Sequence, residues 1–182
     1  MSETIEQRVI VPVAAAEPEI GRWLWALQDA RQRTLEMVEG LNQEALDWTP
    51  DGLQNSIGTL LYHIALIEAD YLFVDVLGRT DEIPELQPLL PHPDRTEDGR
   101  LWPVAGVSLA DHLARLATVR EHLLAEFAPM LWDVFAHARR VAEYGYAISP
   151  AWTLQHLAQH EAQHRGEIGT LRTLASVSSA VD

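Results

Sequence analysis

Four long segments of the chain repeat apolar residues every three or four positions, and this periodicity constrains the fold more than any other feature. The segments are residues 19–41, 55–77, 108–127 and 150–175. Such spacing places the apolar residues on one face of an α-helix. No segment shows sustained strand alternation, apart from a short extended piece near "RVIVPV". In a chain of 182 residues, this pattern predicts an all-α fold, a four-helix bundle.

Capping and helix-breaking residues give the boundaries of these helices. Asn55 or Ser56 caps the second helix and Gly78 stops it, while Ser108 caps the third. Pro150 stands at a first-turn position and opens the fourth helix.

The remaining segments are expected to connect or flank the helices. Residues 80–106 contain five of the ten prolines and predict an irregular connection, a long crossover between helices two and three. For residues 130–149, short helical pieces are favoured over strands. We expect a single domain over 1–182, with an N-terminal arm at 1–18 and a frayed tail at 176–182.

The last predicted helix carries histidines inside its apolar face. At about 100° per residue, His160 and His164 fall among Leu157, Ile168 and Leu171. Burying a polar group without a partner costs on the order of 1–3 kcal/mol. Residues four apart on a helix are neighbours, so both imidazoles can face one metal ion. The alternative is two core histidines bonded to backbone carbonyls.

Residues 160–164 also read H-E-x-x-H, the signature of zinc proteases, but the rest of that pattern is missing. The 18 residues after His164 contain no histidine, so the longer zinc-protease pattern lacks its third histidine ligand. Glu161 falls beside the apolar face, which makes it a weak general base. The sequence therefore argues against a protease.

A third ligand must come from upstream, and His63 is the best candidate. It lies at the edge of the second helix's apolar face, from where it can point into the mouth of a bundle. His156 lies two turns before His164, about 12 Å along a straight helix, too far to share one ion. The other histidines face outward, border a helix face or lie in irregular segments.

Two motifs resemble those of the DinB/YfiT-like superfamily. They are "NSIGTLLYHIALIEADYL" at 55–72 and "HLAQHEAQHRGEIG" at 156–169, and "LNQEALDWTPDG" before them is also similar. The resemblance implies a four-helix bundle, commonly a homodimer, holding a divalent ion, most often zinc or nickel. It implies the ligands His63, His160 and His164. Branches of the family include maleylpyruvate isomerases, thiol S-transferases using bacillithiol, mycothiol or glutathione, and hydrolases.

Three neutral imidazoles leave such an ion with charge +2 and open positions. The ion can then lower the pKa of water to near 7, or ionise an external thiol. The chain has no Cys, so the thiol would be a low-molecular-weight cosubstrate. The group that attacks a small-molecule substrate is therefore expected to be metal-bound water or thiolate.

Several polar residues stand where apolar ones are expected, and they are candidates to support the site. Glu68, Arg120 and Arg31 lie on apolar helix faces. One interpretation is that they form buried ion pairs. The other is that they orient the metal ligands or bind a carboxylate of the substrate. Glu167 lies one turn after His164 and His156 one turn before His160, so both are candidates to orient a ligating histidine, and Glu167 is also a candidate fourth ligand.

Composition excludes several classes of partner. The net charge of −14 disfavours nucleic acid and anionic membranes. The first 19 residues lack the apolar core of a signal peptide, so a cytoplasmic protein is expected. Two alternatives to an enzyme stay open: a non-catalytic metal-binding structural or stress-response bundle, and a degenerate bundle that binds nothing.

Overall fold

The computed structural model describes residues 7–79, 84, 86–141 and 145–178, and its helical content confirms the predicted all-α class. The elements in chain order are α1 (Pro18–Val38), α2 (Gln43–Asp47), α3 (Ile57–Asp70), the π-helix η1 (Tyr71–Val76), α4 (Leu109–Phe127), α5 (Trp132–Ala136), β1 (Arg139–Val141), β2 (Tyr146–Ile148) and α6 (Pro150–Ser178).

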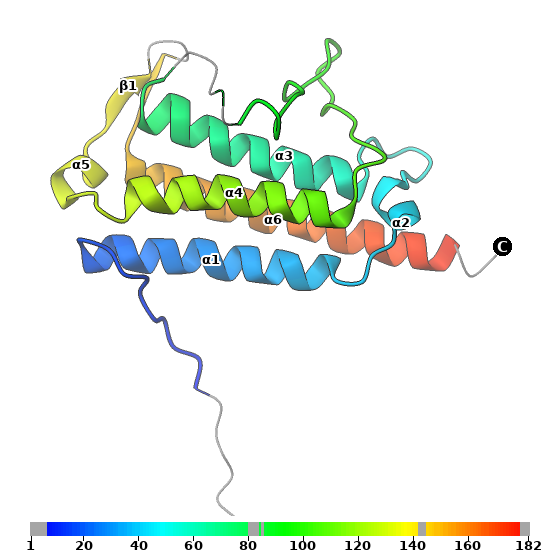
Figure 1. Ribbon diagram of the computed structural model, residues 1–182, viewed down its shortest axis with the longest axis horizontal. Helices are drawn as coiled ribbons and strands as arrows, with labels where there is room; N and C mark the ends of the chain where they lie inside the picture. The colour runs from blue at the N-terminus through cyan, green and yellow to red at the C-terminus, as the bar shows by residue number, and fades with distance from the viewer. Residues whose placement is uncertain (1–6, 80–83, 85, 142–144, 179–182) are drawn as a thin grey trace, which may run out of the picture.

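The four long helices α1, α3, α4 and α6 run side by side and enclose one apolar core (Figure 1). α1 packs along α6, and α3 packs against both α4 and α6. Leucines from all four helices, among them Leu24, Leu60, Leu123 and Leu154, are fully buried. Burial of a leucine side chain contributes about 1.5–3 kcal/mol, so this shared core holds the helices together.

The predicted helix starts are confirmed by their caps. The Ser56 hydroxyl accepts a hydrogen bond of 3.1 Å from the Thr59 N–H. The Ser108 hydroxyl likewise accepts from the Asp111 N–H at 3.1 Å. Both bonds satisfy N–H groups that a first helical turn leaves without partners.

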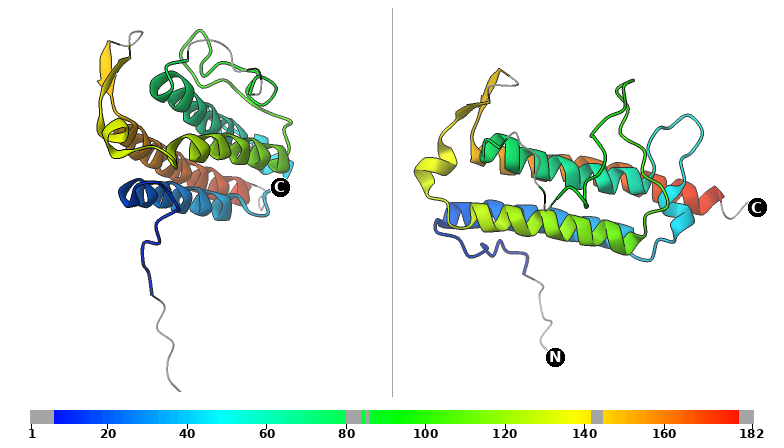
Figure 2. Two further views of the ribbon diagram at one scale, coloured as in Figure 1. Left: turned by 60° about the vertical axis from the view of Figure 1, so that its left-hand side comes forward. Right: turned by 45° about the horizontal axis from the view of Figure 1, so that its top comes forward.

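The preference for helical pieces over strands at 130–149 was wrong in part. α5 is such a piece, but Arg139–Val141 and Tyr146–Ile148 form an antiparallel hairpin, with Arg140 opposite Ala147. Gly145 has a φ of 71°, a conformation that glycine adopts without strain and that suits a hairpin turn. The hairpin stands beside the start of α6, as both views in Figure 2 show.

The second long helix does not stay α-helical to its end. From Tyr71 onward it widens into η1, where the Leu77 N–H donates to the Leu72 carbonyl five residues earlier. Such π segments are rare and often border functional sites. α6 continues to Ser178, three residues past its predicted end, and residues 179–182 of the expected tail lie outside the described residues.

The connection between η1 and α4 has no helix among its described residues, 77–79, 84 and 86–108, and its one strand-like feature is a bridge between Arg95 and Leu101. It rises over α3 (Figure 1). Residues 80–83 and 85 of the predicted irregular stretch lie outside the described residues.

Ile57–Val76 is long and apolar enough to cross a membrane by length and composition alone. However, 72% of its most apolar window is buried inside the fold, as expected of a core helix in a soluble protein.

Candidate metal centre

Three histidine side chains from two helices converge at one point. His63 comes from α3, and His160 and His164 come from consecutive turns of α6. The Nε2 atom of His160 lies 3.2 Å from that of His63 and 3.1 Å from that of His164. His63 and His164 are buried, and His160 is half-buried. The structure thus brings together the three histidines singled out from the sequence.

These distances fit a shared metal ion. Nitrogen ligands at 2.0–2.1 Å from a tetrahedral ion lie about 3.3 Å apart, close to the separations of the Nε2 atoms. The same spacing also suits an N–H···N hydrogen bond between neighbouring rings, whose direction is set by the ring tautomers. Within the described residues, the potential ligand atoms that gather here belong to these three histidines and to no carboxylate.

A carboxylate faces the far ring nitrogen of two of these histidines. Nδ1 of His63 lies 2.8 Å from Oδ1 of Asp94, and Nδ1 of His164 lies 3.3 Å from Oε1 of Glu167. Neither Nδ1 atom has a hydrogen bond of regular geometry among the described residues, so these are close polar contacts. A carboxylate at Nδ1 favours the proton there and leaves the Nε2 lone pair free for a metal.

Asp94 is placed by the irregular connection, which Tyr62 of α3 anchors. The Tyr62 hydroxyl donates to the His92 carbonyl at 2.7 Å and accepts from the His92 N–H at 2.8 Å. His92 also stacks on Trp102, with ring centroids 5.4 Å apart. The loop is therefore fixed to α3 at Tyr62, the residue directly before His63, through His92, which lies two residues before Asp94. Sequence analysis missed Asp94, because an irregular segment has no periodicity to place its side chains.

Burial keeps His63 and His160 neutral. Desolvation lowers the pKa of His63 to about 4, although Asp94 opposes the shift. Desolvation, with smaller contributions from His164 and His63, lowers the pKa of His160 to about 3. A neutral imidazole is the form that ligates a metal, so His63 and His160 can bind an ion without first losing a proton.

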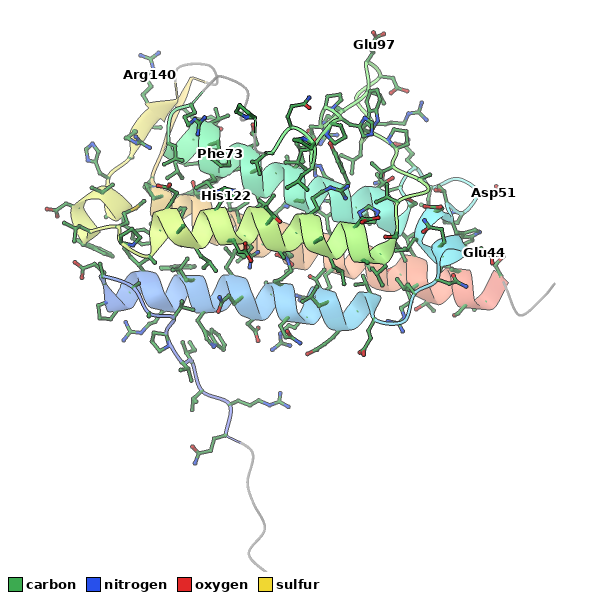
Figure 3. The ribbon with its side chains drawn as sticks, viewed as in Figure 1. Glu44, Asp51, Phe73, Glu97, His122 and Arg140 are labelled. Carbon is green, nitrogen blue, oxygen red and sulfur yellow. The ribbon has the colours of Figure 1, made fainter. Side chains whose placement is uncertain are left out.

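The other histidines lie elsewhere. His156 stacks on Trp152 and its ring centroid is 6.0 Å from that of His160, so it borders the cluster without joining it. The rings of His122 (α4) and Phe73 (η1) have their centroids 6.0 Å apart. Figure 3 labels both side chains. His112 is buried beside Arg115, and His137 is exposed.

A known protein family matches most of this chain. The sequence pattern of the DinB superfamily covers residues 26–168, which include all three histidines. The chain belongs to the DinB superfamily. No curated protein matches the chain. Membership confirms the resemblance seen in the motifs at 55–72 and 156–169, and it is compatible with a metal-binding protein.

In this DinB-superfamily chain, a buried ionic tetrad lies beside the histidines and takes one side chain from each long helix. Its members are Arg31 (α1), Glu68 (α3), Arg120 (α4) and Glu161 (α6). Arg120 donates to Glu68 at 2.6 and 2.9 Å and to Glu161 at 3.0 Å. Arg31 donates to Glu161 at 2.7 Å and to Glu68 at 2.8 Å. The predicted buried ion pair is thus a closed, charge-balanced network.

Glu161, the glutamate of the H-E-x-x-H run, is ion-paired within the tetrad. Burial raises the pKa of Glu68, but Arg120 and Arg31 outweigh burial and hold it below its ordinary value. Glu161 shares the same two guanidinium groups and is 2% exposed. It is therefore committed to an ionic network, which agrees with the rejection of a protease.

Replacing Asp94 with alanine is expected to weaken metal affinity about 10–100-fold, the usual cost of removing a carboxylate that orients a ligating histidine. Asp94 is partly exposed, so stability should change little. Competition titration with a chromophoric chelator measures the affinity. Asp98→Ala, in the same loop and without a histidine contact among the described residues, is the control. An unchanged affinity in Asp94→Ala would show that this contact does not orient His63.

Acid is expected to destabilise the metal-free protein through its buried histidines, and His112 isolates the effect. Burial, with the nearby Arg115 charge, lowers the pKa of His112 to about 4. The unfolded chain takes up this proton near pH 6.5, so the stabilisation is complete above that pH and is lost toward pH 4. The free energy of unfolding, measured with denaturant, should fall between pH 6.5 and 4 by about 2 kcal/mol less in His112→Gln than in the unsubstituted protein. An unaltered pH dependence would contradict this assignment.

Proposed function

We propose that this protein binds one divalent metal ion through His63, His160 and His164 and uses it to act on a small molecule. The observation that carries the proposal is the convergence of three histidines from two helices, with the Nε2 atom of His160 at 3.2 Å from that of His63 and 3.1 Å from that of His164. The favoured reaction is thiol-dependent S-transfer or hydrolysis, and zinc and nickel are the favoured ions.

The chemistry of the donor set supports this proposal. An ion held by three neutral imidazoles acts as a Lewis acid and ionises a water or thiol that reaches it. In this chain His63 and His164 would hold the ion through Nε2, while Asp94 and Glu167 keep the opposite nitrogens protonated. His63 and His164 are buried, and a low local dielectric strengthens the attraction between a bound ion and an anion.

A non-catalytic structural or stress-response metal protein is the alternative function. A structural zinc site is usually closed by a fourth protein ligand. Among the described residues the converging group has three members, and Glu167 faces the far nitrogen of its histidine. This geometry favours the enzyme.

Family membership supports further proposals about the molecule as a whole. We take it to be a single-domain four-helix bundle with a long crossover, forming a homodimer in the cytoplasm. Its partners would be a small-molecule substrate and a low-molecular-weight thiol. The net charge of −14 supports the absence of nucleic-acid and membrane partners.

A thermal-shift screen of untagged, metal-loaded protein tests the function. Glutathione, bacillithiol and mycothiol are compared, with S-methylglutathione as the matched ligand that cannot form a thiolate. At a hundred times its dissociation constant, the right thiol should stabilise the fold by about 2.7 kcal/mol. The shift should vanish in metal-free protein. If none of the thiols stabilises the metal-loaded protein more than S-methylglutathione does, S-transfer is rejected and hydrolysis is left.

A further inference from the structure

A pocket of about 450 Å³ lies between the hairpin, η1 and the start of α6. Its lining residues are Tyr71, Ala138, Tyr146, Ala147, Ile148, Ser149 and Trp152. None of these side chains is charged. Tyr146 and Trp152 are 42% and 47% exposed, so two large rings present apolar surface that the fold itself does not cover. A pocket of this lining suits a neutral, apolar group.

A row of rings along α6 joins this pocket to the histidine cluster. Trp152, His156, His160 and His164 are spaced four residues apart and therefore share one helix face. Trp152 stacks on His156 with centroids 4.8 Å apart and planes 6° from parallel. His156 also packs on Tyr71 at 4.7 Å, and its centroid lies 6.0 Å from that of His160. The pocket and the cluster are thus neighbours along the same surface.

The pocket walls are fixed to one another. Nη2 of Arg139 in β1 donates to the Asp75 carbonyl of η1 at 3.4 Å. The Tyr146 side chain in β2 hydrogen-bonds the buried Asp75 carboxyl, where burial and Asp70 raise the pKa to about 6 despite this bond. Since η1 also carries Tyr71, these contacts hold the hairpin wall against the opposite wall. A preformed pocket binds a ligand without the cost of ordering loops.

We propose that this pocket binds a flat, neutral, apolar end of the substrate, such as an aryl group, while the reactive end lies at the histidine cluster. This inference rests on the proposed function and adds the class of substrate. Trp152 and His160 are two helical turns apart, about 12 Å. The substrate is therefore elongated: an aromatic group at one end, a metal-seeking group at the other, and a linker that passes His156.

Hydroxamates provide the test, because their head group chelates metal ions. Zinc-loaded protein is titrated calorimetrically with octanohydroxamate and with 8-phenyloctanohydroxamate, which differ by one ring. Burying that ring should strengthen binding about tenfold or more. Trp152→Ala should abolish the advantage of the phenyl compound. Trp132→Ala is the control, because Trp132 is 48% exposed, Trp152 is 47% exposed, and Trp132 does not line the pocket. This variant should keep the affinity advantage of the phenyl compound.

The outcomes separate the two proposals. Equal affinity for both hydroxamates, or a phenyl advantage that survives Trp152→Ala, overturns the pocket assignment and leaves the metal site standing. If octanohydroxamate binds metal-free and metal-loaded protein equally, the proposed function fails, and the substrate assignment fails with it. A phenyl advantage that needs both Trp152 and zinc supports both.

Discussion

Replacing Arg120 with methionine is expected to lower the free energy of unfolding by about 3–5 kcal/mol, the cost of leaving a buried charge without its partner. Arg120 is 6% exposed and joins α4 to Glu68 of α3 and Glu161 of α6. Its third donor reaches the Leu27 carbonyl of α1 at 2.9 Å. Methionine fills a similar volume but supplies none of these bonds. Urea denaturation measures the change.

A surface pair on the same fold is the control. Arg33 and Asp29 form an i,i+4 pair on α1 whose side chains are 58% and 36% exposed. Arg33→Met should cost less than about 1 kcal/mol, because solvent screens such pairs. If Arg120→Met lowers the free energy of unfolding by no more than Arg33→Met does, the tetrad does not hold the helices in place.

The tetrad also bears on the metal centre, because Glu161 directly follows His160 and Glu68 shares α3 with His63. An uncompensated glutamate in this network would push the two helices apart. We therefore expect Arg120→Met to weaken metal affinity as well as stability, while Arg33→Met leaves affinity unchanged.

Replacing His160 with alanine is expected to reduce metal affinity by more than a hundredfold, beyond the roughly 10–100-fold that loss of an orienting residue costs. The Nε2 atom of His160 lies between those of His63 and His164, at 3.2 and 3.1 Å. Its loss leaves two ligands, too few to hold an ion against solvent. Elemental analysis after dialysis and competition titration give the stoichiometry and the affinity.

His122→Ala is the matched control for this experiment. It removes an imidazole that packs on Phe73, away from the cluster, and should keep one metal ion per chain. Since the pKa of His160 is lowered mainly by burial, its removal should not destabilise the metal-free protein. Stoichiometric metal in His160→Ala would mean that the proposed ligand set is wrong.

The sequence predicted those parts of the structure that depend on local patterns. Ser56 and Ser108 cap helices because their hydroxyls reach N–H groups three residues on, a purely local geometry. His63 could be predicted as a third ligand because the apolar periodicity of its helix placed it at the edge of the buried face. The structure places it with His160 and His164. Their role as ligands stays a prediction.

The parts that sequence analysis missed depend on contacts between distant segments. Glu68, Arg31 and Arg120 stood out as polar residues on apolar faces, but their pairing with Glu161 requires the helices to be assembled. Asp94 reaches His63 only because Tyr62 anchors the loop.

The hairpin escaped prediction for a different reason. Its strands, Arg139–Val141 and Tyr146–Ile148, are three residues each, too short for alternation to be recognised. The pocket that depends on them was therefore invisible in the sequence.

X-ray absorption at the zinc edge, on untagged protein carrying one equivalent of zinc, tests the central claim most directly. Our account predicts three imidazole nitrogens at about 2.0–2.1 Å, plus at least one light ligand that exogenous thiol replaces with sulfur. A spectrum with fewer than three imidazoles, or with four protein ligands that no thiol displaces, would contradict it.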